Sequence, residues 1–282
     1  MHRADSFARV KRNSNWKEKE MFYYGQSDVG MHRKINEDSY WAENMWGQEA
    51  TLLVVCDGMG GHKAGEVASR TAVETFCDMI ISSPCLSYKI DDVKEELRRK
   101  ISAAVKEANT KIYNLSKKYT EMSGMGTTLV AAIEYKGLLV VANIGDSRMY
   151  ISTPAKTLQL SHDHSYVQHL IDSNIITKEE AKSYPRKNVI TRAVGIGPQA
   201  EVDIFFSDLK TWGNGYLLLC SDGLSNYVSE KDISNTFNRA SKIDPGPHGT
   251  ADLEFAVHEF ITAANNGGGA DNITALTARY SI

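Results

Sequence analysis

Residues 51–66 read TLLVVCDGMGGHKAGE, an apolar run that ends in an acid and a cluster of glycines. The run TLLVVC is rich in branched apolar residues, which predicts a buried strand. The glycines that follow allow the backbone to bend tightly. From residue 65 the pattern predicts a helix over 65–81, with one side formed by Val67, Thr71, Phe76 and Ile80.

Five further segments show strand composition, namely 21–28 (MFYYGQSD), 127–134 (TTLVAAIE), 138–144 (LLVVANI), 216–220 (YLLLC) and 273–280 (ITALTARY). Residues 135–137 form a short turn between two of these strands, which predicts an antiparallel hairpin. Apolar residues recur every three or four positions over 92–117 and 251–264, which predicts two more helices. Hairpins separated by occasional long helices favour an α+β fold, in which helices cover antiparallel sheets.

Composition excludes several classes of protein. The chain has 282 residues, of which 42% are hydrophobic and 24% charged, as in ordinary globular proteins. The net charge of -3 gives no support for a nucleic-acid partner. We find neither an apolar run near the ~20 residues of a membrane span nor the apolar core of a secretory signal. We therefore expect a cytoplasmic protein without membrane contact. A monomer is the default expectation.

The chain is expected to form one folded unit behind a short extension. Residues 1–20 hold six Lys or Arg against three Asp or Glu and little apolar periodicity, which predicts a flexible extension, with a basic interaction arm as the alternative. Residues 21–282 are expected to form a single domain, with 241–250 (SKIDPGPHGT) as a loop. Cys56 and Cys220 end apolar runs, which predicts small buried core residues.

Acids adjoin four of the predicted strands. Asp57, Asp146 and Asp222 follow strands directly or after one residue, and Asp271 stands just before 273–280. Taken singly, an acid beside glycine is an ordinary turn signal. Together they can converge, because strand ends of a packed sheet lie close in space. Converging carboxylates need positive charge among them, and oxygen ligands without Cys or His favour Mg²⁺ or Mn²⁺ over zinc.

Two other segments suggest phosphate chemistry. Residues 33–38 (RKINED) join a guanidinium that can bind phosphate in a bidentate manner to two acids, with a solvated charged loop as the alternative. His62 lies close to Asp57 in sequence, where an imidazole can donate a proton to a leaving alkoxide. An exposed histidine at a helix N-terminus is the alternative. Residues 162–164 (HDH) can chelate a metal, but a solvated loop edge is the favoured interpretation.

These motifs resemble those of the metal-dependent protein phosphatase 2C (PP2C or PPM) family of Ser/Thr protein phosphatases. Six of them occur in the family's order and spacing: RxxNED, VCDGMGGHxAGE, GMGTT, NIGDSR, CSDGL and GGADNIT. DGMGGH and the stretch 188–195 (NVITRAVG) are similar to the bacterial branch. The resemblance covers about 24–280. It implies two antiparallel sheets flanked by helices (α/β/β/α), with a flap at about 161–195 that includes a short helix over 165–172.

The resemblance also implies roles for the acids. Asp57 matches the aspartate that bridges two metals, and Gly58 matches the position that supplies a carbonyl ligand. Asp222 and Asp271 match other direct ligands, and Glu37 matches an acid that holds a metal-bound water.

Four further roles follow from the same resemblance. Asp38 matches a residue that supports the ligands. Asp146, with Asp222, matches the site of a weaker third metal. Arg33 matches the phosphate-binding arginine, and His62 is the candidate proton donor, although three residues separate it from Asp-Gly here and none do in other branches.

The implied reaction is hydrolysis of phosphoserine or phosphothreonine in proteins. Two Mn²⁺ or Mg²⁺ ions would hold a hydroxide that attacks phosphorus, opposing a Ser/Thr kinase that acts on the same proteins. A pseudophosphatase that only binds is the alternative. A cysteine-dependent phosphatase is disfavoured because the residue six positions after each cysteine is not arginine, and a metal-dependent nuclease lacks support in charge or motif.

Overall fold

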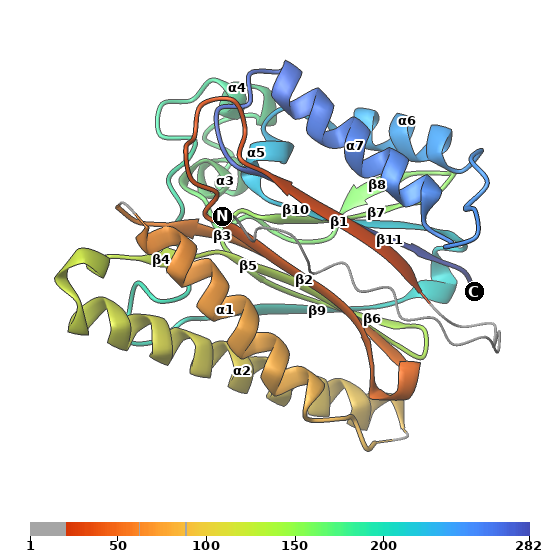
Figure 1. Ribbon diagram of the computed structural model, residues 1–282, viewed down its shortest axis with the longest axis horizontal. Coiled ribbons are helices and arrows are strands. Elements are labelled where there is room, and N and C mark those ends of the chain that lie inside the picture. The colour runs from red at the N-terminus through yellow and green to blue at the C-terminus, as the bar shows by residue number, and fades with distance from the viewer. Residues whose placement is uncertain (1–20, 62, 88) are drawn as a thin grey trace, which may run out of the picture.

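The computed structural model describes residues 21–282 except 62 and 88, so the predicted extension 1–20 and His62 lie outside the described residues. Two antiparallel sheets pack face to face, and helices cover both outer faces (Figure 1). The α+β fold predicted from the sequence, an α/β/β/α sandwich, is therefore confirmed.

Each sheet is named after one of its inner strands. The β10 sheet has the order β1-β11-β10-β7-β8, formed by β1 (Phe22–Asp28), β11 (Ile273–Tyr280), β10 (Gly215–Cys220), β7 (Arg148–Ser152) and β8 (Thr157–Gln159). The β3 sheet has the order β2-β3-β5-β6-β9, formed by β2 (Asp38–Met45), β3 (Ala50–Met59), β5 (Leu129–Tyr135), β6 (Leu138–Ile144) and β9 (Asp203–Asp208). The two-residue strand β4 (Gly126–Thr127) pairs with the end of β3.

Long helices form the outer layers. The β3 sheet is covered by α1 (Ala64–Ile81) and α2 (Ile90–Lys118), and the β10 sheet by α6 (Glu230–Ala240) and α7 (Ala251–Asn266). Shorter helices lie in the connections, namely α3 (Tyr166–Asp172), α4 (Lys178–Lys182) and α5 (Asp222–Ser225), with 3₁₀ turns at Trp46–Gln48, Thr120–Met122 and Leu209–Thr211.

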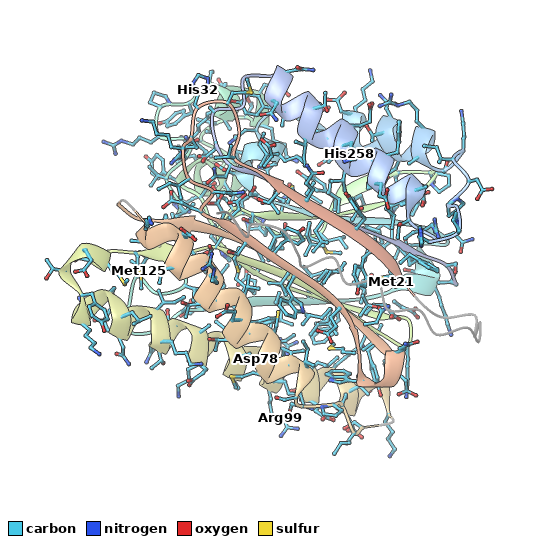
Figure 2. All side chains as sticks on the ribbon, in the orientation of Figure 1. Met21, His32, Asp78, Arg99, Met125 and His258 are labelled. Atoms are coloured by element: carbon cyan, nitrogen blue, oxygen red, sulfur yellow. The ribbon has the colours of Figure 1, made fainter. Side chains whose placement is uncertain are left out.

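Strand β3 shows why the sequences of the central strands are continuous apolar runs. Leu52, Val54 and Cys56 pack toward the helices, whereas Leu53 and Val55 pack against the other sheet. Successive side chains of a strand point to opposite faces, so a strand covered on both sides must be apolar at every position. Figure 2 shows side chains filling the spaces between the layers.

Most of the predicted elements are present. The hairpin is confirmed by the antiparallel pairing of β5 with β6, in which Tyr135 lies opposite Leu138. The three predicted helices are present and each is slightly longer than expected, and Ser165 caps the short helix α3. All four cysteines are buried and free. Residues 241–250 form neither helix nor strand, as predicted.

Two predictions were wrong in detail. Val67 and Thr71 are only half-buried, because α1 turns its small residues Ala68 and Ala72 to the sheet. Strand β3 does not end at Cys56 but continues to Met59 by pairing with β4. Strands β2, β7, β8 and β9 and helix α6 were not predicted.

Among the described residues, no helix combines the length and apolar character that a bilayer span requires.

The packing between the sheets predicts a large loss of stability on truncation. Leu276 in β11 is fully buried in the inter-sheet core. We expect Leu276→Ala to lower the free energy of unfolding by about 2–5 kcal/mol, through lost burial and a residual cavity. The matched control Leu86→Ala, at a side chain that is 77% exposed, should change it by less than about 0.5 kcal/mol. Urea denaturation measures both, and equal effects would contradict this account of the core.

Candidate metal centre

Asp57 is held within a strand rather than in a turn. Its N–H donates to Thr128 Oγ1 (2.9 Å), and its carbonyl oxygen accepts from Thr128 N–H (2.9 Å) and Thr127 Oγ1 (2.8 Å). The two threonines therefore fix the backbone of Asp57 from the neighbouring strands. Their role is therefore structural, beneath the site.

Two glycines allow Glu37 to approach the start of α1. Gly58 N–H donates to the Glu37 carbonyl (3.1 Å). A Cβ on Gly58 would lie 2.1 Å from the Gly65 carbonyl oxygen, and one on Gly65 would lie 2.4 Å from Glu37 Oε1. No side chain fits at either position. The approach leaves the buried Glu37 carboxylate beside Gly65, where burial raises its pKa and the Arg33 charge opposes that rise.

Asp38 links the two sheets. It lies opposite Asp57 in the β2–β3 pairing. Its Oδ2 accepts hydrogen bonds from Ser221 Oγ (2.7 Å), directly after β10, and from Thr274 Oγ1 (2.6 Å) in β11 of the other sheet. This buried carboxylate therefore ties the edge strand β2 to the ends of β10 and β11.

Asp146 follows β6 after one residue, and two further acids lie next to the ends of β10 and β11. Asp222 begins α5 immediately after β10, and its Oδ2 accepts from Asn226 Nδ2 (3.2 Å). Asp271 stands before β11, and its Oδ2 accepts from Arg33 (2.8 Å). The side chain of Arg33 is 46% exposed and also lies 3.8 Å from Glu37. The guanidinium is thus on the open side of the carboxylates.

Asn272 organises the loop that carries Arg33, and the sequence analysis did not single it out. Its Oδ1 accepts from Glu37 N–H (2.8 Å), and its Nδ2 donates to the carbonyl oxygens of Val29 and Ile35 (3.0 Å each). A buried amide bonded to backbone groups on both sides of a loop fixes that loop's shape. Its position directly after Asp271 was the available signal.

The interpretation of 162–164 as a solvated loop edge was wrong for two of the three residues. Asp163 is buried and forms a bidentate ion pair with Arg148, whose Nε donates to Oδ1 (3.0 Å) and whose Nη2 donates to Oδ2 (2.6 Å). His164 is buried against the turn that carries Asp146. Only His162 is exposed, where it contacts Asp172 (2.9 Å).

The structure brings the predicted acids together. Burial raises the pKa of Asp57 well above its usual value, and the charges of Asp38, Asp222, Asp146 and Asp271 raise it further. Burial likewise raises the pKa of Asp38 and of Asp146 to about 7 in each case, with Asp222 adding to the rise in both. Burial and the charge of Asp271 raise the pKa of Asp222. The charged form of each of these carboxylates is thus destabilised by burial and, in addition, by its neighbours.

Three oxygens of this cluster fit a bound cation. Glu37 Oε1, Asp38 Oδ1 and Asp222 Oδ1 are buried without a hydrogen-bond partner. Buried carboxylate oxygens ordinarily have partners, and hard divalent cations bind such oxygens. Within the described part of the chain, no three His, Cys, Asp or Glu side chains are spaced as a closed ligand set. The residues thus supply oxygen atoms of the kind that a divalent cation binds, although their side chains do not form a closed ligand set.

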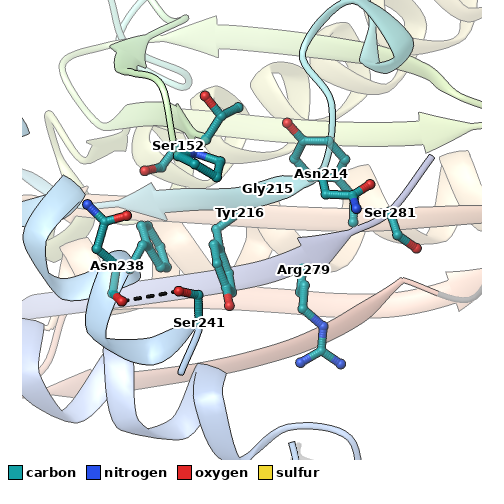
Figure 3. A pocket seen from close by; sticks show the side chains of 12 residues that line it. Ser152, Asn214, Gly215, Tyr216, Asn238, Ser241, Arg279 and Ser281 are labelled. Carbon is teal, nitrogen blue, oxygen red and sulfur yellow. Dashed lines mark hydrogen bonds between the residues drawn. The ribbon is translucent and has the colours of Figure 1, made fainter. Parts of the chain in front are cut away.

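A cavity elsewhere lacks this chemistry. It has a volume of about 220 Å³ and lies at the opposite end of β10, between α6 and the last residues of β11 (Figure 3). It is lined by Tyr216, Asn238, Arg279 and nine other residues, none of them acidic. It therefore provides no carboxylate for a metal.

Comparisons with known proteins agree with this geometry. The model of the family described as protein phosphatase 2C matches residues 32–253. A serine/threonine phosphatase named stp, from Listeria welshimeri, is 38% identical over 258 residues, which are 91% of this chain and 95% of the relative. The chain belongs to the protein phosphatase 2C family. It is thus a serine/threonine protein phosphatase by class.

Solved structures of protein phosphatase 2C relatives share the fold. Serine/threonine phosphatase Stp1 from Staphylococcus aureus superposes with a TM-score of 0.80 at 30% identity, covering 97% of this chain and 100% of that one. The catalytic domain of the phosphatase PstP, solved with two manganese ions, gives a TM-score of 0.76 at 32% identity, covering 93% and 99%.

The raised pKa values in this protein phosphatase 2C chain predict an unusual pH dependence of stability. A carboxyl group whose pKa is about 7 when folded and 3.8 when unfolded retains its proton longer in the folded state. Folding is therefore disfavoured progressively as the pH rises from about 4 to 7. In a chelator, we expect Asp38→Asn to gain stability relative to the wild type over this range, because its amide carries no charge.

Denaturant unfolding at several pH values measures this difference. Asp91→Asn, at a side chain that is 91% exposed, serves as the matched control and should show a constant difference. A pH-independent difference for Asp38→Asn would contradict the assignment of repulsion to this cluster.

Proposed function

We propose that this chain hydrolyses phosphoserine and phosphothreonine in proteins at a centre for two divalent cations, Mn²⁺ or Mg²⁺, and so opposes a Ser/Thr kinase. The observation that carries the proposal is the cluster of buried carboxylates with orphaned oxygens beside a half-exposed arginine. The two manganese ions in the PstP structure support the choice of cation.

The proposed ligands lie on rigid elements. Asp57 and the Gly58 carbonyl come from β3, Asp222 from the start of α5, and Asp271 from the residue pair before β11. Glu37 is proposed to hold a water ligand, with Asp38 fixing the surrounding hydroxyl groups. Asp146, near Asp222, is proposed to complete a weaker third site. Bound cations would lower the pKa of a ligated water and neutralise phosphate charge, the two needs of phosphomonoester hydrolysis.

Arg33 is proposed to bind the phosphate. A guanidinium has five N–H donors in a planar fork that suits two phosphate oxygens. One nitrogen already donates to Asp271, which fixes the orientation of the fork while leaving the side chain half-exposed to an incoming group. Arg33 therefore can orient the phosphoryl group toward the carboxylates without being buried among them.

The leaving oxygen of serine or threonine needs a proton. We propose that His62 donates this proton; it lies three residues after the end of β3, outside the described residues.

We further propose that the segment 161–195 acts as a flap that contacts the protein substrate, because both ends of the segment lie beside the turn that holds Asp146. The pseudophosphatase alternative has no support, since the relatives are named as phosphatases and every expected acid is present.

Loss of the proposed ligands should separate activity from folding. We expect Asp57→Asn and Asp222→Asn each to lower manganese-dependent hydrolysis of a phosphothreonine peptide by more than ~100-fold, because changes to residues that only support ligands already lower activity ~10–100-fold. Both variants should be at least as stable as the wild type in a chelator, since each removes a repelling charge.

Asp91→Asn, on the exposed side of α2, is the matched control and should retain full activity. Near-wild-type rates for Asp57→Asn or Asp222→Asn would refute the ligand assignment. Hydrolysis that persists in excess chelator would refute the dependence on divalent cations.

A further inference from the structure

The neighbouring residues Asp163 and His164 hold the turn that carries Asp146 from both of its sides. Asp163 binds Arg148, two residues after Asp146, through the bidentate ion pair. His164 binds Gly145, the residue before it, through two hydrogen bonds. The carboxylate that is proposed to hold the weaker cation is thus presented by a turn fixed at its two ends.

The hydrogen bonds of His164 define its tautomer. Its backbone N–H donates to the Gly145 carbonyl (2.8 Å), and its Nδ1 accepts from Gly145 N–H (3.2 Å). A ring nitrogen that accepts carries no hydrogen, so the hydrogen of the neutral ring lies on Nε2. Nε2 then donates to Asp203 Oδ2 (3.1 Å). The imidazole therefore bridges the two elements: its Nδ1 accepts a hydrogen bond from the turn, and its Nε2 donates one to β9.

The outer side of His164 connects to the returning end of segment 161–195. Arg192 Nη1 donates to Asp203 Oδ1 (2.9 Å) and lies 3.3 Å from His164 Nε2. Thr191 N–H donates to the His164 carbonyl (2.8 Å). Further along, Val194 pairs with Thr127, which also binds the Asp57 carbonyl. His164 thus stands between the returning segment and the turn of Asp146.

We propose that His164 is a positioning residue: its neutral ring, oriented by Asp203 and Arg192, holds Gly145 so that Asp146 faces Asp222. This inference rests on the proposed function, because it assigns Asp146 to the cation centre. It predicts that the Nδ1 contact with Gly145 matters for turnover more than the Nε2 contact with Asp203 does. A buried histidine with a purely structural role would show no such asymmetry.

Two substitutions separate the contacts. In His164→Asn the amide oxygen can take the place of Nδ1 as acceptor for Gly145 N–H, whereas the contact with Asp203 is lost. In His164→Gln the longer amide can reach Asp203 but leaves Gly145 N–H without its acceptor. We expect His164→Asn to keep kcat for a phosphothreonine peptide within about threefold of the wild type, and His164→Gln to lower it ~10–100-fold. KM should change less than kcat in both.

Amide hydrogen exchange supplies a readout that does not depend on activity. The Gly145 amide should stay protected in the wild type and in His164→Asn, and should exchange at least ~10-fold faster in His164→Gln. His258→Gln, at an exposed histidine on α7, is the matched control and should change neither quantity. If the whole chain proved inactive, the proposed function would fail, while the exchange experiment would still test the role of His164.

Three outcomes would overturn the inference. Equal loss of kcat in both His164 variants, or normal kcat in His164→Gln, would remove the asymmetry on which it rests. If both variants failed to fold, Asp203→Ala would decide, because Asp203 is 54% exposed and its removal leaves the core intact. We expect this variant to accelerate Gly145 exchange and lower kcat at least threefold, and unchanged values would assign His164 a structural role alone.

Discussion

Mutual repulsion among carboxylates is the constraint on which the rest of this molecule depends. Burial raises the pKa values of Asp38, Asp57, Asp146 and Asp222, and the charges of neighbouring acids raise them further because little water is left to screen those charges. A fold that brings such carboxylates together loses stability unless a cation binds among them. The surrounding scaffold is built to hold the carboxylates in place against that repulsion.

The sandwich supplies that scaffold through pairings between strands that are far apart in sequence. The β2–β3 register sets Asp38 opposite Asp57, and hydroxyl groups of Ser221 and Thr274 reach Asp38 from the other sheet. Asn272 fixes the loop of Arg33 through backbone contacts. Asp57, Asp146, Asp222 and Asp271 adjoin the inner strands β3, β6, β10 and β11. Because both faces of these strands are covered by side chains, the acids cannot move apart without disturbing the core. The same rigidity is what a phosphoryl-transfer site needs.

The sequence was most informative where both faces of a strand are buried. Strand composition, rich in branched apolar residues, revealed β3, β5, β6, β10 and β11, and amphipathic spacing revealed α1, α2 and α7. The edge strands β2 and β9 have many half-exposed polar residues, so their pattern does not stand out from a loop. Helix α6 was missed although Ser229 and Asp232 form a capping box at its start, a signal that was present in the sequence.

The acids of the site were predictable because each adjoins a recognisable strand, whereas their supporting contacts were not. Asn272, Ser221 and Thr274 act through hydrogen bonds between elements more than 50 residues apart. Spacing along the chain does not predict such contacts, and only the position of Asn272 directly after Asp271 was a signal. Asp163 and His164 were misjudged for the same reason. They sit in a polar stretch, yet the fold buries them against Arg148 and Gly145.

Anomalous diffraction from crystals of the full chain grown with Mn²⁺ tests the central claim most directly, since it locates the ions themselves. The account predicts two strong peaks among Asp57, Asp222, Asp271 and the Gly58 carbonyl, with Arg33 released from Asp271 or shifted along it. Peaks confined to other places, such as the exposed pair His162 and Asp172, or side chains of Asp57 and Asp222 that turn away from any ion, would contradict it.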